Sequence, residues 1–236
     1  MNSGDRARIL LVLAIVGVLV LLIMYGAPKP RVPSVSNRRP RLKPVTPLPI
    51  NDEIADEIRS EVRAGFEPRE RIIEIFREEK YRRGELNVGE ITKAVDDEFA
   101  KLREEQKSWP AETDCDRLDK AFNELNSAGI IALQNAGFDQ SDGYGDFRDA
   151  YNQSHDKSAV AGYCFYHGQD LERAQQGEGL LLAFGPVDAK NEPTLGPKIG
   201  QRIVKILEAH GFKTEWNGKF NSRIKITRFE WKKRIQ

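Results

Sequence analysis

The chain has 236 residues, of which 31% are charged and 39% hydrophobic, and its formal net charge at pH 7 is +1. A chain of this length holds one moderate domain or two small ones. The near-neutral charge argues against nucleic-acid binding, which usually needs a strongly basic domain. The two cysteines, Cys115 and Cys164, are too few for a disulfide scaffold or a four-cysteine zinc site. We expect reduced thiols, with a single disulfide as the alternative if the domain lies outside the cell.

The first element in chain order is an apolar segment at residues 9–27, which reads ILLVLAIVGVLVLLIMYGA and has no charged side chain. At ~1.5 Å rise per residue, a helix of this length matches the hydrocarbon core of a bilayer. A cleaved signal peptide is the alternative. It is disfavoured because Tyr25 stands where signal peptidase requires a small residue, and because Pro28 would follow a cut after Ala27. We therefore predict an uncleaved transmembrane signal-anchor, preceded by a tail of residues 1–8.

Charges around this segment indicate its orientation. The side that follows the segment has six basic residues before its first acid, Asp52: Lys29, Arg31, Arg38, Arg39, Arg41 and Lys43. Because positive flanks stay on the cytoplasmic side, we expect a single pass through a bacterial inner membrane with the C-terminal domain in the cytoplasm. Arg6 and Arg8, which precede the segment, favour the opposite orientation.

Residues 28–50 contain seven prolines and so predict an extended linker. At ~3.1 Å per residue the linker could hold a domain up to about 70 Å from the bilayer. Its basic cluster could instead contact anionic lipid headgroups. Pro30 and Pro33 also form one PxxP pattern, the pattern that proline-recognition domains bind.

Residues 51–108 predict a subdomain of three short amphipathic helices. In the first, Ile54, Ile58 and Val62 recur every four residues and share one face. The second is expected to begin near Pro68, and the third after Asn87, which with Glu90 has the spacing of a capping box.

Residues 109–236 predict an α+β domain. Thr113 is expected to cap a helix, and apolar runs near 130–137, 159–168 and 179–187 predict three strands. Short helices are expected at about 147–155 and 170–176, and a longer one after Gly196 and Pro197. A closing hairpin with its turn near 217–221 completes about five strands in a mixed or antiparallel sheet with flanking helices. The near alternative is an α/β fold.

Long, ordered stretches of the chain resemble a bacterial domain family of unknown function. They include TDCDRLDKAF, GYCFYHGQDLERA and GLLLAFGP, and the resemblance covers residues from about 51 to 234. It implies one unit of helices followed by an α+β region, with the anchor and linker added to it. It implies no activity, cofactor or catalytic residue.

One set of residues could support nucleophilic catalysis. Cys115 lies in the first turn of a predicted helix, where the pKa of a thiol falls. His167 could serve as its base and Asp170 could orient the histidine. The three residues would have to meet in space for a hydrolase-like site, and a structural role for each is the competing interpretation.

The sequence favours neither a metal nor a nucleotide site. The three histidines are scattered, and the acidic segment with Asp139, Asp142, Asp146 and Asp149 lacks the spacing of a calcium loop. We interpret it as a solvated turn with helix-capping aspartates. The glycines before residue 180 lack the strand–loop–helix context of phosphate loops. We therefore expect no cofactor.

A binding surface is a further candidate. Along the strand near 162–167, alternation places Tyr163, Phe165 and His167 on one face and Cys164 and Tyr166 on the other. If the first face is open, its tyrosine and histidine would suit a binding surface. Packing of both faces into the core is the alternative.

These observations favour a non-enzymatic binding or regulatory module at a membrane surface. Its expected partners are the lipid bilayer and a protein, and not nucleic acid. The alternatives are a membrane-tethered hydrolase-like enzyme that uses Cys115 and His167, and an immunity-type protein that neutralises a toxin at the membrane.

Overall fold

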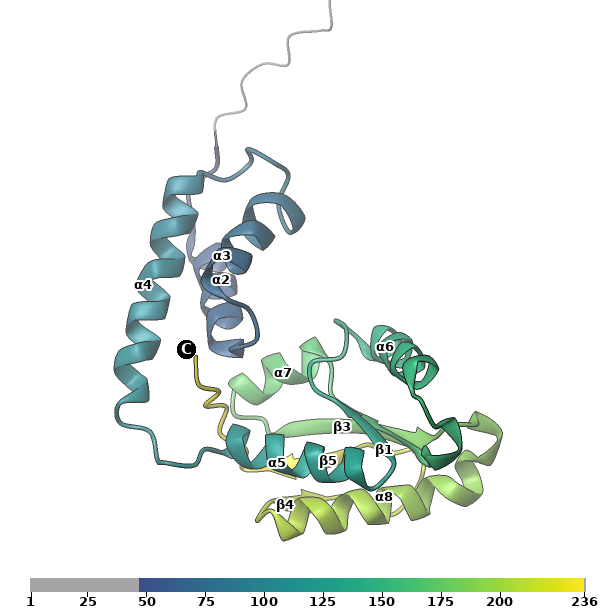
Figure 1. Cartoon of the computed structure of the whole chain (residues 1–236). Helices are drawn as coiled ribbons and strands as arrows, with labels where there is room; N and C mark the ends of the chain where they lie inside the picture. Colours follow the sequence, from purple (N-terminus) through teal and green to yellow (C-terminus); the bar gives the residue numbers. More distant parts are fainter. Residues whose placement is uncertain (1–46, 236) are drawn as a thin grey trace, which may run out of the picture. The chain divides into compact units, whose positions relative to one another are not determined.

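The computed structural model describes residues 47–235, which belong to one compact unit (Figure 1). The predicted anchor at 9–27 and the basic cluster at 29–43 lie outside the described residues. Within residues 47–235, no helix combines the length and the hydropathy needed to cross a bilayer. The described part is α+β, as predicted, with seven α-helices and one five-stranded sheet.

Three helices form the first part of the unit, as the periodicity predicted: α2 (Asp52–Ala64), α3 (Arg69–Glu74) and α4 (Val88–Gln106). A π-helical stretch, Ile75–Glu79, extends α3. Asn51 caps α2 through its side chain, and Gly65 ends it with a left-handed backbone. The apolar stripes of the helices face one another and form a core of their own from residues between Ile54 and Leu102.

The second part carries the sheet. Its helices are α5 (Asp114–Ser127), α6 (Gln140–Gln153), α7 (Gly168–Gln175) and α8 (Glu192–Ala209), and its strands are β1 (Ile130–Leu133), β2 (Gly162–Phe165), β3 (Leu180–Pro186), β4 (Lys213–Glu215) and β5 (Ile224–Thr227). The strand order is β1-β2-β3-β5-β4. Only β1 and β2 are parallel, and the other neighbours pair antiparallel. The sheet is therefore mixed, and the closing β4–β5 hairpin is confirmed.

Both faces of the sheet are covered (Figure 1). On one face α5 and α8 bury a large core that includes Cys164 and Tyr166, and on the other α6 packs against Tyr163 and Phe165. The alternation predicted for β2 is thus confirmed, and its two faces contribute to different cores. α7 leaves the end of β2 and packs against α2 and β3.

Two helices begin earlier than the sequence predicted. The segment predicted as a turn before residue 147 is the first half of α6, with Asp139 as its N-cap and Asp142 completing a capping box. Gly143 resembles a turn residue but lies inside the helix. A glycine is needed at this position because any larger side chain would overlap the buried ring of Phe165. Likewise α8 begins at Glu192, and Pro197 lies within it.

Capping of α4 differs from the prediction in one detail. Asn87 caps the helix through hydrogen bonds from the backbone amides of Gly89 and Glu90. The Glu90 carboxylate, however, accepts from the Ile50 amide at 3.2 Å instead of returning to the cap residue. At the start of α5 the predicted cap is confirmed, because Thr113 and Asp116 form a capping box.

The segment after β5 joins the helical core to the sheet. Trp231 donates from Nε1 to the Arg63 carbonyl at 3.0 Å, and its ring lies against Phe66 and Tyr166. Between α2 and α7, Ser60 donates to the Gln175 Oε1 at 2.7 Å. The two cores thus share hydrogen bonds and aromatic contacts.

Candidate functional site

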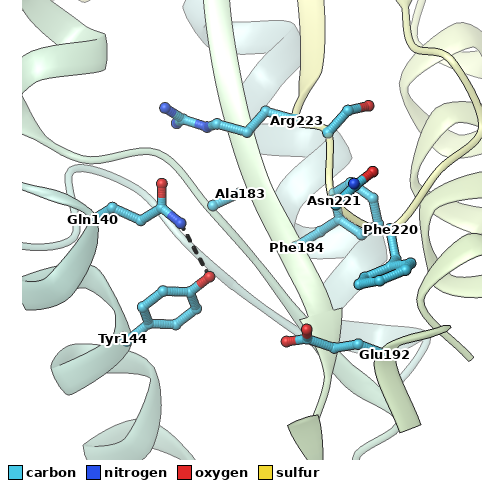
Figure 2. Close-up of a pocket in the computed structure, with 9 residues that line it drawn as sticks. Gln140, Tyr144, Ala183, Phe184, Glu192, Phe220, Asn221 and Arg223 are labelled. Atoms are coloured by element: carbon cyan, nitrogen blue, oxygen red, sulfur yellow. Dashed lines mark hydrogen bonds between the residues drawn. The ribbon is translucent and has the colours of Figure 1, made fainter. Parts of the chain in front are cut away.

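A polar cavity of about 340 Å³ opens between α6, β3, the start of α8 and the loop that precedes β5. Figure 2 shows its lining, with Gln140 and Tyr144 on one side and Phe220 and Asn221 on the other. Arg223 and Glu192 contribute opposite charges at separate parts of the wall. The full lining comprises Gln140, Tyr144, Ala183, Phe184, Glu192, Phe220, Asn221, Ser222 and Arg223.

A buried ionic network anchors Arg223. Its Nη2 donates to Oδ2 of Asp170 and, at 3.1 Å, to the carbonyl of Leu181 in β3. The Asp170 side chain has no solvent exposure, whereas 24% of the Arg223 side chain is exposed. A buried carboxylate needs such a partner because desolvating an unpaired charge costs several kcal/mol. Asp170 therefore fixes the guanidinium at the cavity wall.

His167 completes the network. Its Nε2 lies 3.1 Å from Oδ2 of Asp170, and its backbone amide donates to the same oxygen at 3.3 Å. Sequence explains this geometry locally, since His167 is the N-cap of α7 and Asp170 is its third residue, where a carboxylate reaches back to the cap. Burial lowers the pKa of His167, an effect opposed by Asp170 and reinforced by Arg223.

Three polar atoms of this network are buried without a hydrogen-bond partner among the described residues: Nδ1 of His167, Oδ1 of Asp170 and Nε of Arg223. Buried polar atoms usually have partners, so a cluster of three is uncommon and marks sites of function or strain. The network therefore retains hydrogen-bonding capacity next to the cavity.

Tyr144 lines the cavity from α6, and the buried Tyr163 packs against it without lining the cavity. Tyr144 accepts a hydrogen bond from Nε2 of Gln140 at 3.1 Å, and its ring meets Tyr163 edge-on with centroids 5.6 Å apart. Burial raises the pKa of Tyr163, and the nearby Tyr144 and Glu192 raise it further. The Tyr163 hydroxyl therefore stays protonated at neutral pH and can act as a hydrogen-bond donor.

The structure brings together two of the three residues considered for catalysis. His167 and Asp170 are in contact, as described above. Cys115 is 3% exposed and belongs to the core under α5, and burial raises the pKa of its thiol to about 12. Within residues 47–235, Cys115 forms no hydrogen bond with His167. Because a neutral thiol is a weak nucleophile, the geometry gives the predicted nucleophile little support.

The residues predicted for a binding surface are buried. Tyr163 is 4% exposed, Phe165 is fully buried, and both pack under α6, while His167 is 3% exposed at the start of α7. Among residues 47–235, no group of three or more His, Cys, Asp or Glu side chains is arranged to hold a metal ion. Asp139 and Asp142 are instead engaged in capping α6.

Sequence reasoning missed the cavity residues Gln140, Tyr144, Glu192, Asn221 and Arg223. They come from three separated stretches, and the central pair, Arg223 with Asp170, is 53 residues apart. The only local signal is a basic residue placed directly before the alternating strand Ile224–Thr227. That signal is common at strand ends and does not indicate a buried partner.

Together, the fold and the site define a class of α+β protein with a mixed sheet and a helical subdomain. Its polar cavity lies beside a buried His–Asp–Arg network. Residues 49–235 match the model of the family described as Domain of unknown function (DUF6891). The chain belongs to this family, in agreement with the resemblance noted from its motifs. Comparison with the curated proteins and with the solved structures found no match in either set.

Proposed function

We propose that the chain is a single-pass membrane-anchored, non-enzymatic binding or regulatory module that holds a small polar ligand in the cavity beside β5. One observation carries the proposal: Arg223 lines the cavity, the buried Asp170 holds its Nη2, and its Nη1 donates no hydrogen bond among the described residues. A positioned guanidinium with unused donors is suited to recognising a carboxylate or phosphate.

The size and the polar lining of the cavity fit binding of a small molecule. Ligand sites in proteins usually occupy about 300–1,000 Å³ and contain a few convergent polar groups among apolar ones. Here amide, hydroxyl and charged groups surround the aromatic side chains of Phe184 and Phe220. The arrangement can orient a ligand, and no activated nucleophile is needed for that role.

The membrane anchor in this proposal is supported by the sequence alone. The uncharged run at 9–27 and the basic cluster that follows it support insertion into a bacterial inner membrane with the domain in the cytoplasm. In that arrangement the bilayer is one partner. The second is a cytoplasmic protein that distinguishes the ligand-bound domain from the ligand-free domain.

Topology can be tested on the full chain in bacterial cells. A C-terminal reporter that is active on only one side of the membrane should signal from the cytoplasm, and the protein should fractionate with membranes. Deletion of residues 9–27 should move it to the supernatant. A reporter signal from outside would overturn the proposed orientation, and wild-type protein in the supernatant would overturn the anchor.

Ligand binding can be tested by thermal shift on the full chain in detergent. The probes are the free amino acids, nucleoside monophosphates and monosaccharides. Asn221→Trp fills the cavity mouth from an exposed position, and Asn123→Trp is the matched control at an exposed position on α5. We expect at least one class to stabilise the wild type and the control but not Asn221→Trp. No stabilisation by any class, or equal stabilisation of all three proteins, would refute cavity binding.

A hydrolase-like enzyme is a second candidate because His167 and Asp170 are 3.1 Å apart. Hydrolysis of p-nitrophenyl acetate offers a direct test. Turnover that disappears in both Cys115→Ser and His167→Ala, with folding retained, would favour the enzyme. Turnover unaffected by either substitution would exclude this pair as its catalytic groups.

A further inference from the structure

We infer that the cavity beside β5 takes a zwitterion, with the carboxylate of the ligand at Arg223 and its ammonium group at Glu192. This inference rests on the proposed function and narrows it to one chemical class, small amino acids or the ends of short peptides. It follows from the presence of two opposite charges at separate parts of the cavity lining (Figure 2).

The cationic end of the site is pre-organised. Nη2 of Arg223 is committed to Asp170 and to the Leu181 carbonyl, so the guanidinium cannot rotate freely. Nε is buried, so the donors left for a ligand are those on Nη1, which form no hydrogen bond within residues 47–235. A ligand carboxylate would supply acceptors for such donors with charge-assisted hydrogen bonds.

The anionic end is Glu192 at the first turn of α8. The helix dipole favours a carboxylate at that position. Glu192 forms no ion pair with another described residue, so its charge is available to a cationic group. Its field also acts on Tyr163 from across the cavity wall. A purely anionic ligand would be repelled here, and a purely cationic one would be repelled by Arg223.

Neutral groups between the charges fit the middle of such a ligand. Gln140 directs its amide nitrogen to Tyr144, which leaves the amide oxygen as an acceptor. Phe220, which is 37% exposed, and Phe184 provide apolar surface for a short side chain. The volume of about 340 Å³ is near the lower end of ligand sites and excludes large peptides.

The test is isothermal titration of the full chain in detergent with individual free amino acids and with the dipeptide Ala-Ala. Each binder is then compared with its amide, which lacks the carboxylate, and with its N-acetyl form, which lacks the ammonium group. We expect each loss of charge to weaken binding by about tenfold or more, since hydrogen bonds to charged groups are among the stronger polar contacts. Binding of Ala-Ala alone would assign the zwitterion to a peptide, and binding of a free amino acid alone would assign it to a metabolite.

Two variants locate the ammonium site. Glu192→Gln should weaken binding of the zwitterion at least about tenfold. It should not weaken binding of the N-acetyl form, because that ligand has no ammonium group and loses only the repulsion from Glu192. Glu208→Gln, near the other end of α8 and exposed, is the matched control and should bind like the wild type. Equal binding of zwitterion, amide and N-acetyl form, or no effect of Glu192→Gln, would overturn the inference.

The inference and the proposed function can fail separately. If a nucleotide or sugar stabilises the wild type but not Asn221→Trp, and no amino acid or dipeptide binds, the inference of a zwitterionic ligand is wrong. The proposed binding of a small polar ligand in the cavity is then still supported. If no probe binds, both are wrong.

Discussion

Replacing Asp170 by Asn tests the energetic role of the buried network. The substitution keeps the shape and one acceptor oxygen but removes the charge that faces Arg223, while the Asp170 side chain is fully buried. Breaking a buried pair on one side costs about 3–5 kcal/mol. Because 24% of the Arg223 side chain is exposed and the Leu181 carbonyl remains as an acceptor, we expect the lower end, about 3 kcal/mol. For a unit of this size that corresponds to a fall of about 6–12 °C in Tm.

Urea unfolding followed by tryptophan fluorescence measures this loss, since Trp231 lies at the junction of the two cores. Asp96→Asn is the matched control, because Asp96 pairs with Arg69 on an exposed surface and its loss should barely move the midpoint. A loss for Asp170→Asn of less than about 1 kcal/mol, or one equal to the control, would show that the network does not hold the site as we argue.

Three further outcomes follow from the structure. The pKa of His167 lies below its ordinary value of 6.5, so the unfolded chain binds the proton first as pH falls and the folded state should lose stability below pH 6.5. Urea midpoints measured between pH 7.5 and 5 should therefore decline less in His167→Gln than in the wild type. The same dependence of the midpoint on pH in both proteins would refute this role of His167. Gly129→Ala should destabilise by at least about 1–2 kcal/mol, because φ is +77° and a methyl group would overlap the Ala159 carbonyl oxygen; a wild-type Tm would contradict this. Cys115 and Cys164 are buried with raised pKa values, so neither should react with a disulfide reagent until urea unfolds the chain, and fast native labelling would argue against their burial.

The fold was predictable where local patterns and burial agree. The four-residue spacing of Ile54, Ile58 and Val62 predicted α2, and all three are buried. Strand alternation at Tyr163 and Cys164 predicted two faces, and the structure places them in different cores. In these cases the periodicity of the apolar residues in the sequence predicts which side chains the fold buries.

Helix starts were less predictable because close packing overrode local propensity. Gly143 lowers helix propensity and favours a turn, yet the helix continues through it because only a glycine lets α6 approach Phe165. Gly200 in α8 is similar, since a side chain there would meet the rings of Trp216 and Phe184. That contact depends on residues far away in the sequence, so no local window contains it.

The candidate site was half predictable. His167 and Asp170 are three residues apart on one capped helix, so their contact follows from helix geometry. Arg223 reaches them only because β5 inserts between β3 and β4 in the sheet order. Antiparallel neighbours separated by a long helix cannot be placed from a single sequence, so the charge that defines the cavity was missed.

The hydrogen bond between Trp231 and the Arg63 carbonyl spans 168 residues and has a consequence for the order of folding. The buried residues of the helical core all lie between Ile54 and Leu102, so they are synthesised long before Trp231. The contacts that Trp231 makes with this part must wait until the final segment emerges from the ribosome. At ~5–20 residues per second, the interval between the synthesis of Leu102 and that of Trp231 lasts about 6–26 s. During that interval the surface around Phe66, which Trp231 later covers, is exposed. A chaperone or protease would therefore bind this surface most readily before the segment after β5 covers it.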